Sequence, residues 1–240
     1  MTAEELRNKL IKLATEEVGY VGDNGTSASV PNKTNKYANW LDGISGFYNG
    51  KKNGYNWCAI FVDYIGMKAM GGDLDIFYAA TYHNSCGAGV RYCRNGYVNV
   101  GRCDAIPQPG DEVFYFNKSS GLYSHTGIVV AVDNNGFTTV EGNCSNSVKM
   151  YVKKFNANDG YEHSFGHPNY EAAAKILTTK EPAKESEAYK DREFTEDEKW
   201  AIECGLFIGY PDGNFHFDDP ITRGQMCTVL KRFSEAVYGM

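Results

Sequence analysis

The first twenty residues alternate apolar and charged positions with the period of a helix. Thr2, followed three residues later by Glu5, forms a capping-box pattern that marks a helix start. Because acids and bases interrupt the apolar positions and no small-residue cleavage site follows, we expect an amphipathic helix and not a signal peptide. Its apolar face comprises Leu6, Leu10, Leu13 and Ala14.

A second strong helix is predicted from residue 57 onward, ending at Gly71-Gly72. The polar stretch before it, roughly residues 22–56, is rich in Gly, Asn, Ser and Lys and is typical of a long surface loop with short helical pieces such as 36–42. The predicted helix repeats Trp57, Ile60, Phe61, Tyr64, Ile65 and Lys68 at helical spacing.

Strand patterns follow, after a Pro109-Gly110-Asp111 turn. The dipeptide Asn135-Gly136 is a strong hairpin signal between two of the strands. We therefore expect residues 1–170 to form one α+β domain with N-terminal helices and an antiparallel sheet. The expected strands lie in DEVFYFN, SHTGIVVAVD, FTTVEGN, VKMYVKKF and HSFGHPNY.

The composition changes after residue 170. Residues 171–193 begin with EAAAK and are rich in Ala, Lys and Glu, which predicts a semi-rigid linker. Residues 194–240 predict two helices around a turn-rich loop, with one capping box at Thr195 and Glu198 and another at Thr222 and Gln225. The second helix carries the apolar stripe Met226, Val229, Leu230, Phe233 and Val237.

Charge and hydropathy exclude two classes of partner. The net charge is −6, and residues 171–240 carry 9 Lys and Arg against 14 Asp and Glu, so no basic patch favours nucleic acid. No apolar run approaches the roughly 18–20 residues that span a bilayer.

The seven cysteines, an odd number, favour reduced thiols. His83, Cys86, Cys93 and Cys103 match no familiar zinc spacing, so we expect no metal there.

Cys58 is the strongest candidate for chemistry because it begins the second helix. A helix N-terminus offers unpaired N–H groups and positive potential, which favour a thiolate and stabilise an oxyanion. His125, at a strand start beside Gly127, has room to face a cleft and to act as a base toward Cys58. Taken alone, a lone cysteine is more often a buried structural residue and a lone histidine more often a surface one.

Glu141 and Asn143 are candidates for the third group, which would orient the imidazole. Their i, i+2 spacing points both side chains to one face of the sheet. If Asn135-Gly136 is a two-residue turn, Asn143 lies across from Ile128, and both candidates reach His125 only diagonally. The register alone therefore does not choose between them.

Together these residues resemble the CHAP family of cysteine, histidine-dependent amidohydrolases/peptidases, over about residues 1–170. The resemblance implies a papain-like fold and hydrolysis of peptidoglycan amide bonds, with Cys58 as nucleophile, His125 as base, Glu141 as the orienting residue and Asn143 as a fourth site residue. Some members bind calcium before the nucleophile, but residues 32–56 offer only Asp42 as an acid, so we expect none. The motifs are NGYNWCAIFV, PGDEVFYF, SHTGIVVAV, VEGN and SFGHPNY.

Residues 207–225, FIGYPDGNFHFDDPITRGQ, resemble one S-layer homology (SLH) motif. Such motifs bind secondary cell-wall polysaccharide, and Arg223 matches their ligand-contacting arginine. Trp57, beside the nucleophile, is a further candidate for contact with substrate or wall. A module of about 45 residues buries its own core poorly, so its apolar stripe should pack either on the catalytic domain or on copies from other chains. We expect the second, self-association through residues 194–240 as a trimer.

The leading hypothesis is an endolysin-like peptidoglycan hydrolase with a Cys–His–Glu mechanism and no cofactor. It would cut either the muramic acid–L-alanine amide or a peptide bond of the stem or cross-bridge, and would bind peptidoglycan and secondary cell-wall polysaccharide. Without a signal peptide or membrane segment it would be made in the cytoplasm and act on the wall after release, as phage lysins do. The alternatives are a non-catalytic wall-binding scaffold on the CHAP fold and a toxin or effector amidase.

Overall fold

The computed structural model describes residues 1–22, 35–83, 88–155, 157–180, 195–203 and 223–238. The chain divides into two compact units, Met1–Glu181 and Pro182–Met240. Within the described ranges, no helix is both long and apolar enough to cross a membrane.

The first unit contains one antiparallel sheet of six strands in the order β1-β6-β2-β3-β4-β5. The five strands expected from the alternating pattern all form, and a two-residue strand, β1, was not foreseen. The mixed helix and antiparallel sheet confirms the α+β class. The strands are β1 (Cys103–Asp104), β2 (Glu112–Asn117), β3 (Leu122–Val132), β4 (Gly136–Glu141), β5 (Lys149–Lys154) and β6 (Tyr161–Gly166).

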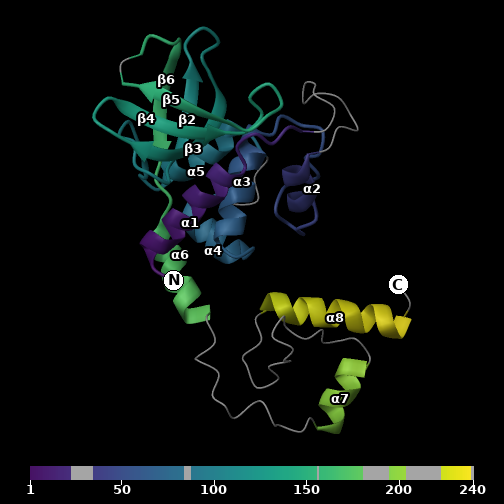
Figure 1. The fold of residues 1–240 in the computed structure, drawn as a ribbon. Helices are drawn as coiled ribbons and strands as arrows, with labels where there is room; N and C mark the ends of the chain where they lie inside the picture. The colour runs from purple at the N-terminus through teal and green to yellow at the C-terminus, as the bar shows by residue number, and fades with distance from the viewer. Residues whose placement is uncertain (23–34, 84–87, 156, 181–194, 204–222, 239–240) are drawn as a thin grey trace. The chain divides into compact units, whose positions relative to one another are not determined.

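Helices α1 (Ala3–Glu16), α3 (Cys58–Ala69) and α5 (Val90–Asn99) all contact β3, and Figure 1 shows them gathered against the sheet. The capping box at Thr2 and Glu5 is confirmed, and the predicted apolar residues of α1 supply its buried face. Apolar burial by these helices on the sheet is the main source of stability in such a unit.

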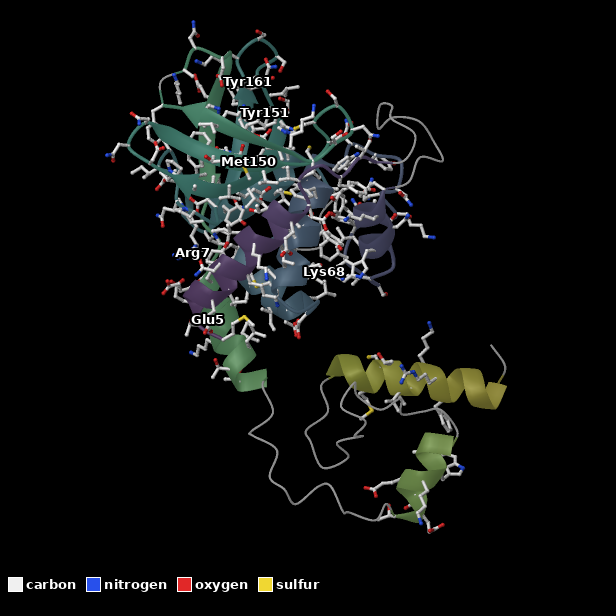
Figure 2. All side chains as sticks on the ribbon, viewed as in Figure 1. Glu5, Arg7, Lys68, Met150, Tyr151 and Tyr161 are labelled. Atoms are coloured by element: carbon white, nitrogen blue, oxygen red, sulfur yellow. The ribbon has the colours of Figure 1, made fainter. Side chains whose placement is uncertain are left out.

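Helix α3 lies in the middle of the core and begins and ends where the sequence predicts. Gly71 and Gly72 follow it with φ of +74° and +80°, a conformation that glycine adopts without strain. Nearly all of its side chains are buried, because α1, the short helix α2 (Lys36–Asp42) and β3 surround it. Lys68, which is labelled in Figure 2, is half-buried, and its Nζ lies 4.1 Å from the centre of the Trp40 ring of α2.

Two helices that follow α3 along the chain and precede the strands were not predicted. In α4 (Leu74–Thr81) the Asp73 carboxylate caps the first turn by accepting from the N–H groups of Asp75 and Ile76. In α5, Gly96 interrupts the helical pattern, yet a Cβ there would lie 2.7 Å from the carbonyl oxygen of Tyr82. Tertiary packing therefore requires the residue that weakens the local helix signal.

The expected linker is shorter than the sequence indicated. Its first ten residues belong to α6 (Tyr170–Lys180), where Tyr170 and Ala173 are buried in the core. The Tyr170 hydroxyl donates to the Gly110 carbonyl at 2.6 Å, and the Arg7 guanidinium of α1 lies 5.4 Å from the centre of the Tyr170 ring. The alanine-rich face that suggested a spacer instead packs against α1 and α4. The rest of the expected linker lies outside the described residues.

The second unit contains α7 (Glu196–Glu203) and α8 (Arg223–Tyr238). The capping box that begins α7 is confirmed, because Thr195 N–H donates to Glu198 Oε2 at 2.8 Å and Glu198 N–H donates to Thr195 Oγ1 at 3.3 Å. The second capping box includes Thr222, which lies outside the described residues.

Candidate functional site

Cys58 is the first residue of α3, with 6% of its surface exposed. The residue before it, Trp57, is the N-cap and makes no side-chain capping hydrogen bond. The first N–H groups of the helix therefore receive no hydrogen bond from the side chain of the N-cap residue. Cys58 thus lies at the start of the helix, as the sequence predicts, and a helix start carries a positive potential.

Trp57 itself does not fit its predicted role as a substrate contact. It is 2% exposed, its Nε1 donates to Asn146 Oδ1 at 3.1 Å, and its ring centre lies 5.4 Å from that of Tyr37. A side chain so enclosed offers no face to a wall polymer. Trp57 instead joins the helix start to the turn after β4, on which Asn146 lies.

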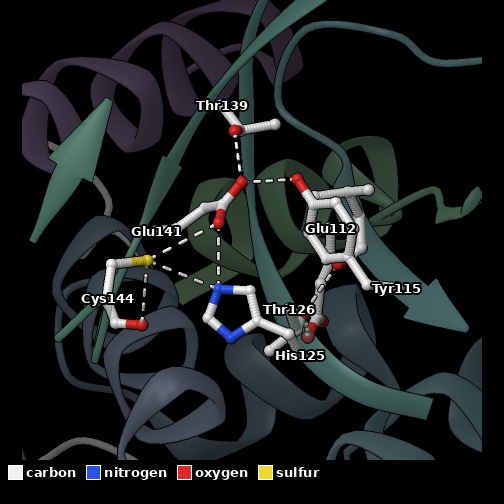
Figure 3. Close-up of polar contacts among 9 residues, drawn as sticks. Glu112, Tyr115, His125, Thr126, Thr139, Glu141 and Cys144 are labelled. Atoms are coloured by element: carbon white, nitrogen blue, oxygen red, sulfur yellow. Dashed lines mark hydrogen bonds and ion pairs between the residues drawn. The ribbon is translucent and has the colours of Figure 1, made fainter. Parts of the chain in front are cut away.

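His125 on β3 and Glu141 at the end of β4 form the centre of the site. The His125 Nε2 lies 2.9 Å from Glu141 Oε2, so the imidazole donates to the carboxylate (Figure 3). The His125 side chain is 26% exposed and that of Glu141 only 3%. A partly open base thus rests against a buried acid, which fixes the orientation of the ring.

The hairpin register differs from the predicted one, and the difference resolves the choice between Glu141 and Asn143. Val132 pairs with Phe137 across a longer loop, and a bulge before Ala131 shifts the ladder again, so that Ile128 faces Val140 and not Asn143. A Cβ on Gly127 would lie 2.5 Å from Glu141 Cγ. Glu141 therefore passes over Gly127 to reach His125.

Two further side chains hold the Glu141 carboxylate. Thr139 Oγ1 donates to Glu141 Oε1 at 2.6 Å, and the Tyr115 hydroxyl donates to the same oxygen (Figure 3). Burial raises the pKa of Glu141, but the hydrogen bond and charge of His125, followed by the bonds from Thr139 and Tyr115, outweigh it and lower the pKa below its usual value. Glu141 thus remains an anion beside the imidazole.

The charge on His125 is stabilised in the same way. Burial lowers its pKa, whereas hydrogen bonding with Cys144, Cys58 and Glu141 outweighs burial and raises the pKa to about 12. The imidazole Nε2 lies 3.6 Å from the Cys144 sulfur and 2.9 Å from the Glu141 carboxylate. Such a ring readily holds a proton taken from a thiol.

Cys144 is a site residue that the sequence analysis did not identify. Its Sγ lies 3.6 Å from His125 Nε2 and 3.6 Å from Glu141 Oε2 (Figure 3). Asn143 and Ser145 on either side of it have φ of +60° and +52°, and this turn brings the sulfur back over the end of β4. Its position next to the VEGN motif was the only available signal.

Asn143, the other predicted site residue, forms no hydrogen bond with His125 in the described part of the chain. Its Nδ2 donates to Asn56 Oδ1 at 3.4 Å, two residues before Cys58. It therefore borders the site and links the turn after β4 to the approach to α3. Arg223 is the first residue of α8 and belongs to the second unit.

A second histidine–carboxylate cluster lies in the core. His83 Nδ1 is 2.8 Å from Asp63 Oδ1, and its Nε2 is 3.3 Å from Glu112 Oε2. The Tyr48 hydroxyl donates to Asp63 at 2.7 Å, and Thr126 Oγ1 donates to Glu112 at 2.8 Å. All three charged side chains are at most 3% exposed, so this cluster joins α3 to β2 and has no access to solvent.

The thiols considered in the sequence as metal ligands do not gather into one site among the described residues. A ligand atom of Cys93 lies within 4.8 Å of those of His83 and Asp63, and Cys103 is not part of that group. Both nitrogens of His83 face carboxylates, as in an ion pair. Cys86 lies outside the described residues.

Comparison with known proteins adds the family. Residues 50–143 match the CHAP domain and residues 199–227 match the S-layer homology domain. The chain thus carries both domains, as the resemblance implied. A CHAP domain indicates a hydrolase of peptidoglycan, and an S-layer homology domain indicates attachment to the cell wall. The first range contains Cys58, His125, Glu141 and Asn143, and the second contains Arg223.

The other comparisons add little. No curated protein matched the chain. A solved structure described as "The crystal structure of Ly7917" is similar with a TM-score of 0.38 and 16% sequence identity, over 70% of this chain. The chain spans 63% of the length of that structure.

Proposed function

We propose that this protein cleaves an amide bond of peptidoglycan with Cys58 as nucleophile, His125 as base and Glu141 as the residue that orients the base. One observation carries the proposal: a buried carboxylate holds the partly exposed His125 imidazole at 2.9 Å, and the Cys58 thiol at the helix N-terminus is among the groups that raise the pKa of His125. A thiol, an imidazole and an orienting acid in this order are the components of a cysteine hydrolase.

The chemistry proceeds in two steps. His125 takes the Cys58 proton as Sγ attacks the carbonyl carbon, and the N–H groups at the start of α3 stabilise the oxyanion. The imidazolium then gives that proton to the departing amine, which leaves an acyl thioester on Cys58. Water, deprotonated by the same imidazole, hydrolyses the thioester and restores the thiol.

Glu141 supports both steps without touching substrate. Because Nε2 is engaged by the carboxylate, Nδ1 is the nitrogen that serves Cys58. The anion beside Nε2 also stabilises the imidazolium that forms when the proton arrives. Thr139 and Tyr115 are positioning residues, since each acts only through Glu141. Asn143 acts as the fourth site residue through its bond to Asn56, which steadies the approach to the nucleophile.

The second unit directs the hydrolase to its substrate. We infer that Arg223 contacts an anionic group of a wall polysaccharide, because an arginine at a helix start combines a planar donor fork with free N–H groups. The exposed apolar side chains of α8, Met226, Leu230 and Phe233, support association with further copies as a trimer. Several catalytic units would then share one wall-binding centre, and avidity would rise. An endolysin-like role fits a protein in which one unit cleaves the wall and the other binds it.

Mass spectrometry of digested walls tests the proposal. Purified peptidoglycan is incubated with the full chain, with Cys58→Ser and with Cys103→Ser, a control at a half-buried thiol on β1. We expect the full chain and the control to release fragments that Cys58→Ser does not release. Free stem peptides and bare glycan would identify an amidase, and cuts within the peptide would identify an endopeptidase. Equal fragment patterns for the full chain and Cys58→Ser would overturn the mechanism.

A further inference from the structure

Cys144 brings a third kind of ligand atom to the edge of the site, and the proposed chemistry does not use it. The Cys144 sulfur lies 3.6 Å from His125 Nε2 and 3.6 Å from Glu141 Oε2, and these two atoms are 2.9 Å apart. A thiol, an imidazole and a carboxylate thus converge on one small triangle (Figure 3). In this arrangement all three ligand atoms lie within 4.8 Å of one another.

The dimensions of this triangle match one face of a tetrahedral zinc site. Zinc binds sulfur at about 2.3 Å and nitrogen or oxygen at about 2.0–2.2 Å. A tetrahedral arrangement of such bonds separates sulfur from nitrogen or oxygen by about 3.5 Å and nitrogen from oxygen by about 3.3 Å. Only the His125–Glu141 separation has to widen, by a few tenths of an ångström.

The donor set favours zinc over the hard cations. Calcium and magnesium prefer oxygen ligands, whereas a combination of thiolate, imidazole and carboxylate suits zinc. Solvent reaches this triangle, since the His125 side chain is 26% exposed and Cys144 is partly exposed. Three protein ligands leave a fourth position of the tetrahedron for water.

The other described group of possible ligands serves as an internal contrast. Asp63, His83 and Cys93 also lie within 4.8 Å of one another, but all three are buried. Both nitrogens of His83 are already directed at carboxylates, at 2.8 and 3.3 Å. An ion would have to break a buried ion pair there, whereas the triangle at Cys144 is open on one side.

We propose that His125 Nε2, Glu141 Oε2 and Cys144 Sγ bind a divalent zinc-class cation that reversibly inhibits this hydrolase; the inhibition rests on the proposed function, and the binding does not. A zinc ion takes the lone pair of a neutral imidazole at Nε2, so the remaining ring proton resides on Nδ1. That nitrogen can then no longer accept the Cys58 proton. The ion also withdraws Glu141 from its orienting role.

Zinc binding to the full chain is the primary test, measured by isothermal titration calorimetry with zinc chloride alone. We expect one site that persists in Cys58→Ser and in Cys103→Ser, and whose affinity falls roughly tenfold or more in Cys144→Ser. Cobalt(II) should give a thiolate-to-metal absorption band in the same proteins, and the band should be lost in Cys144→Ser. Circular dichroism confirms folding. Should Cys144→Ser misfold, Glu141→Gln provides a second variant with the same expected loss of affinity.

The outcomes separate the two proposals. Unchanged zinc affinity in Cys144→Ser or Glu141→Gln, or loss of the site in Cys103→Ser, overturns the metal site whatever the enzyme does. Zinc binding through Cys144 in a protein that does not cut walls would leave the site intact and refute the hydrolase. If both hold, zinc should suppress wall cleavage in the full chain, a chelator should restore it, and Cys144→Ser should retain more of its own metal-free rate at the same zinc concentration.

Discussion

His125 and Thr126 are neighbours on β3, yet their side chains enter two clusters of different character on opposite faces of the sheet. His125 joins Glu141 and Cys144 at a surface that solvent reaches. Thr126 donates to Glu112, which with His83 belongs to the cluster that lies wholly in the core. Each cluster pairs a histidine with a carboxylate at hydrogen-bonding distance, so residue type alone does not distinguish them.

The two clusters differ in how many nitrogens of the histidine ring are held by carboxylates. In the core cluster both His83 nitrogens face carboxylates, so the ring has no nitrogen free for a substrate or a nucleophile. In the open cluster a single carboxylate holds Nε2, and in the proposed mechanism the other nitrogen, Nδ1, accepts the Cys58 proton. The comparison teaches that a second acid makes a histidine structural, whereas one acid and an open edge leave a base available.

Replacing His125 should produce the largest effect on activity. His125→Ala removes the base and should lower the rate of wall cleavage by roughly a thousandfold or more, because Cys58 then has no proton acceptor. The melting temperature should fall less than in His83→Ala, because Thr139 and Tyr115 still donate to the buried Glu141 carboxylate. Turbidity clearance of wall suspensions, together with calorimetry, checks both parts. A variant that clears walls at near-normal rate would remove His125 from the mechanism.

His83→Ala should show the reverse pattern. It leaves Asp63 and Glu112 buried without their partner, which costs about 3–5 kcal/mol of unfolding free energy. The folded fraction should still cleave walls, because the cluster contributes no group to the site. Urea unfolding and activity per folded molecule are the measurements. Loss of activity without loss of stability would mean that the two clusters are functionally linked.

Gly127→Ala tests the path by which Glu141 reaches His125. Gly127 has no positive φ, so alanine is permitted by the backbone, but its Cβ would lie 2.5 Å from Glu141 Cγ. Displacing the carboxylate by a fraction of an ångström should lower the cleavage rate about 10- to 100-fold. Ala131→Ser, at an exposed position of the same strand, is the control and should keep its rate. Equal rates for the two variants would show that the position of Glu141 is not critical.

The pH dependence of stability gives the most gradual contrast. Burial lowers the pKa of His83, but the charge of Glu112 and the hydrogen bond to Asp63 outweigh it and raise the pKa to about 10. Because this lies above the unfolded value of about 6.5, the stabilisation is complete below that pH and is lost as pH rises through about 10. The melting temperature of the full chain should therefore fall toward alkaline pH more steeply than the melting temperature of His83→Gln. Parallel curves would show that His83 is not charged in the folded protein.

Much of the fold was predictable because its signals are local. The capping box of α1, the glycine pair after α3 and the alternation of β2 to β6 depend on neighbouring residues only. Helix α5 was missed because Gly96 weakens its local helix signal. The reason for a glycine there is close packing on the Tyr82 carbonyl, a contact that spacing along the chain does not reveal. The boundary at residue 170 was misplaced for the same reason, since an alanine-rich helix looks alike as a spacer and as a packed element.

For the candidate site, the sequence indicates which residues take part but not how they are arranged. Cys58, His125 and Glu141 follow from a helix start, a strand start and a family resemblance. The hairpin register could not be predicted in this way. Asp133 Oδ1 accepts from the N–H groups of both Asn135 and Gly136, and these bonds extend the loop. Burial of Trp57 and the return of Cys144 toward His125 depend on contacts across the fold. These contacts decide which candidates meet the reacting atoms.

The central claim is that Cys58, and not Cys144, is the nucleophile that His125 activates. Limited alkylation of the full chain with iodoacetamide, followed by peptide mapping and wall-cleavage assays on the same samples, tests it most directly. We predict that activity falls in proportion to modification of Cys58, and that Cys58 reacts first although it is less exposed than Cys144. Full cleavage activity in molecules modified at Cys58, or loss of activity that follows modification of Cys144 alone, would contradict the account.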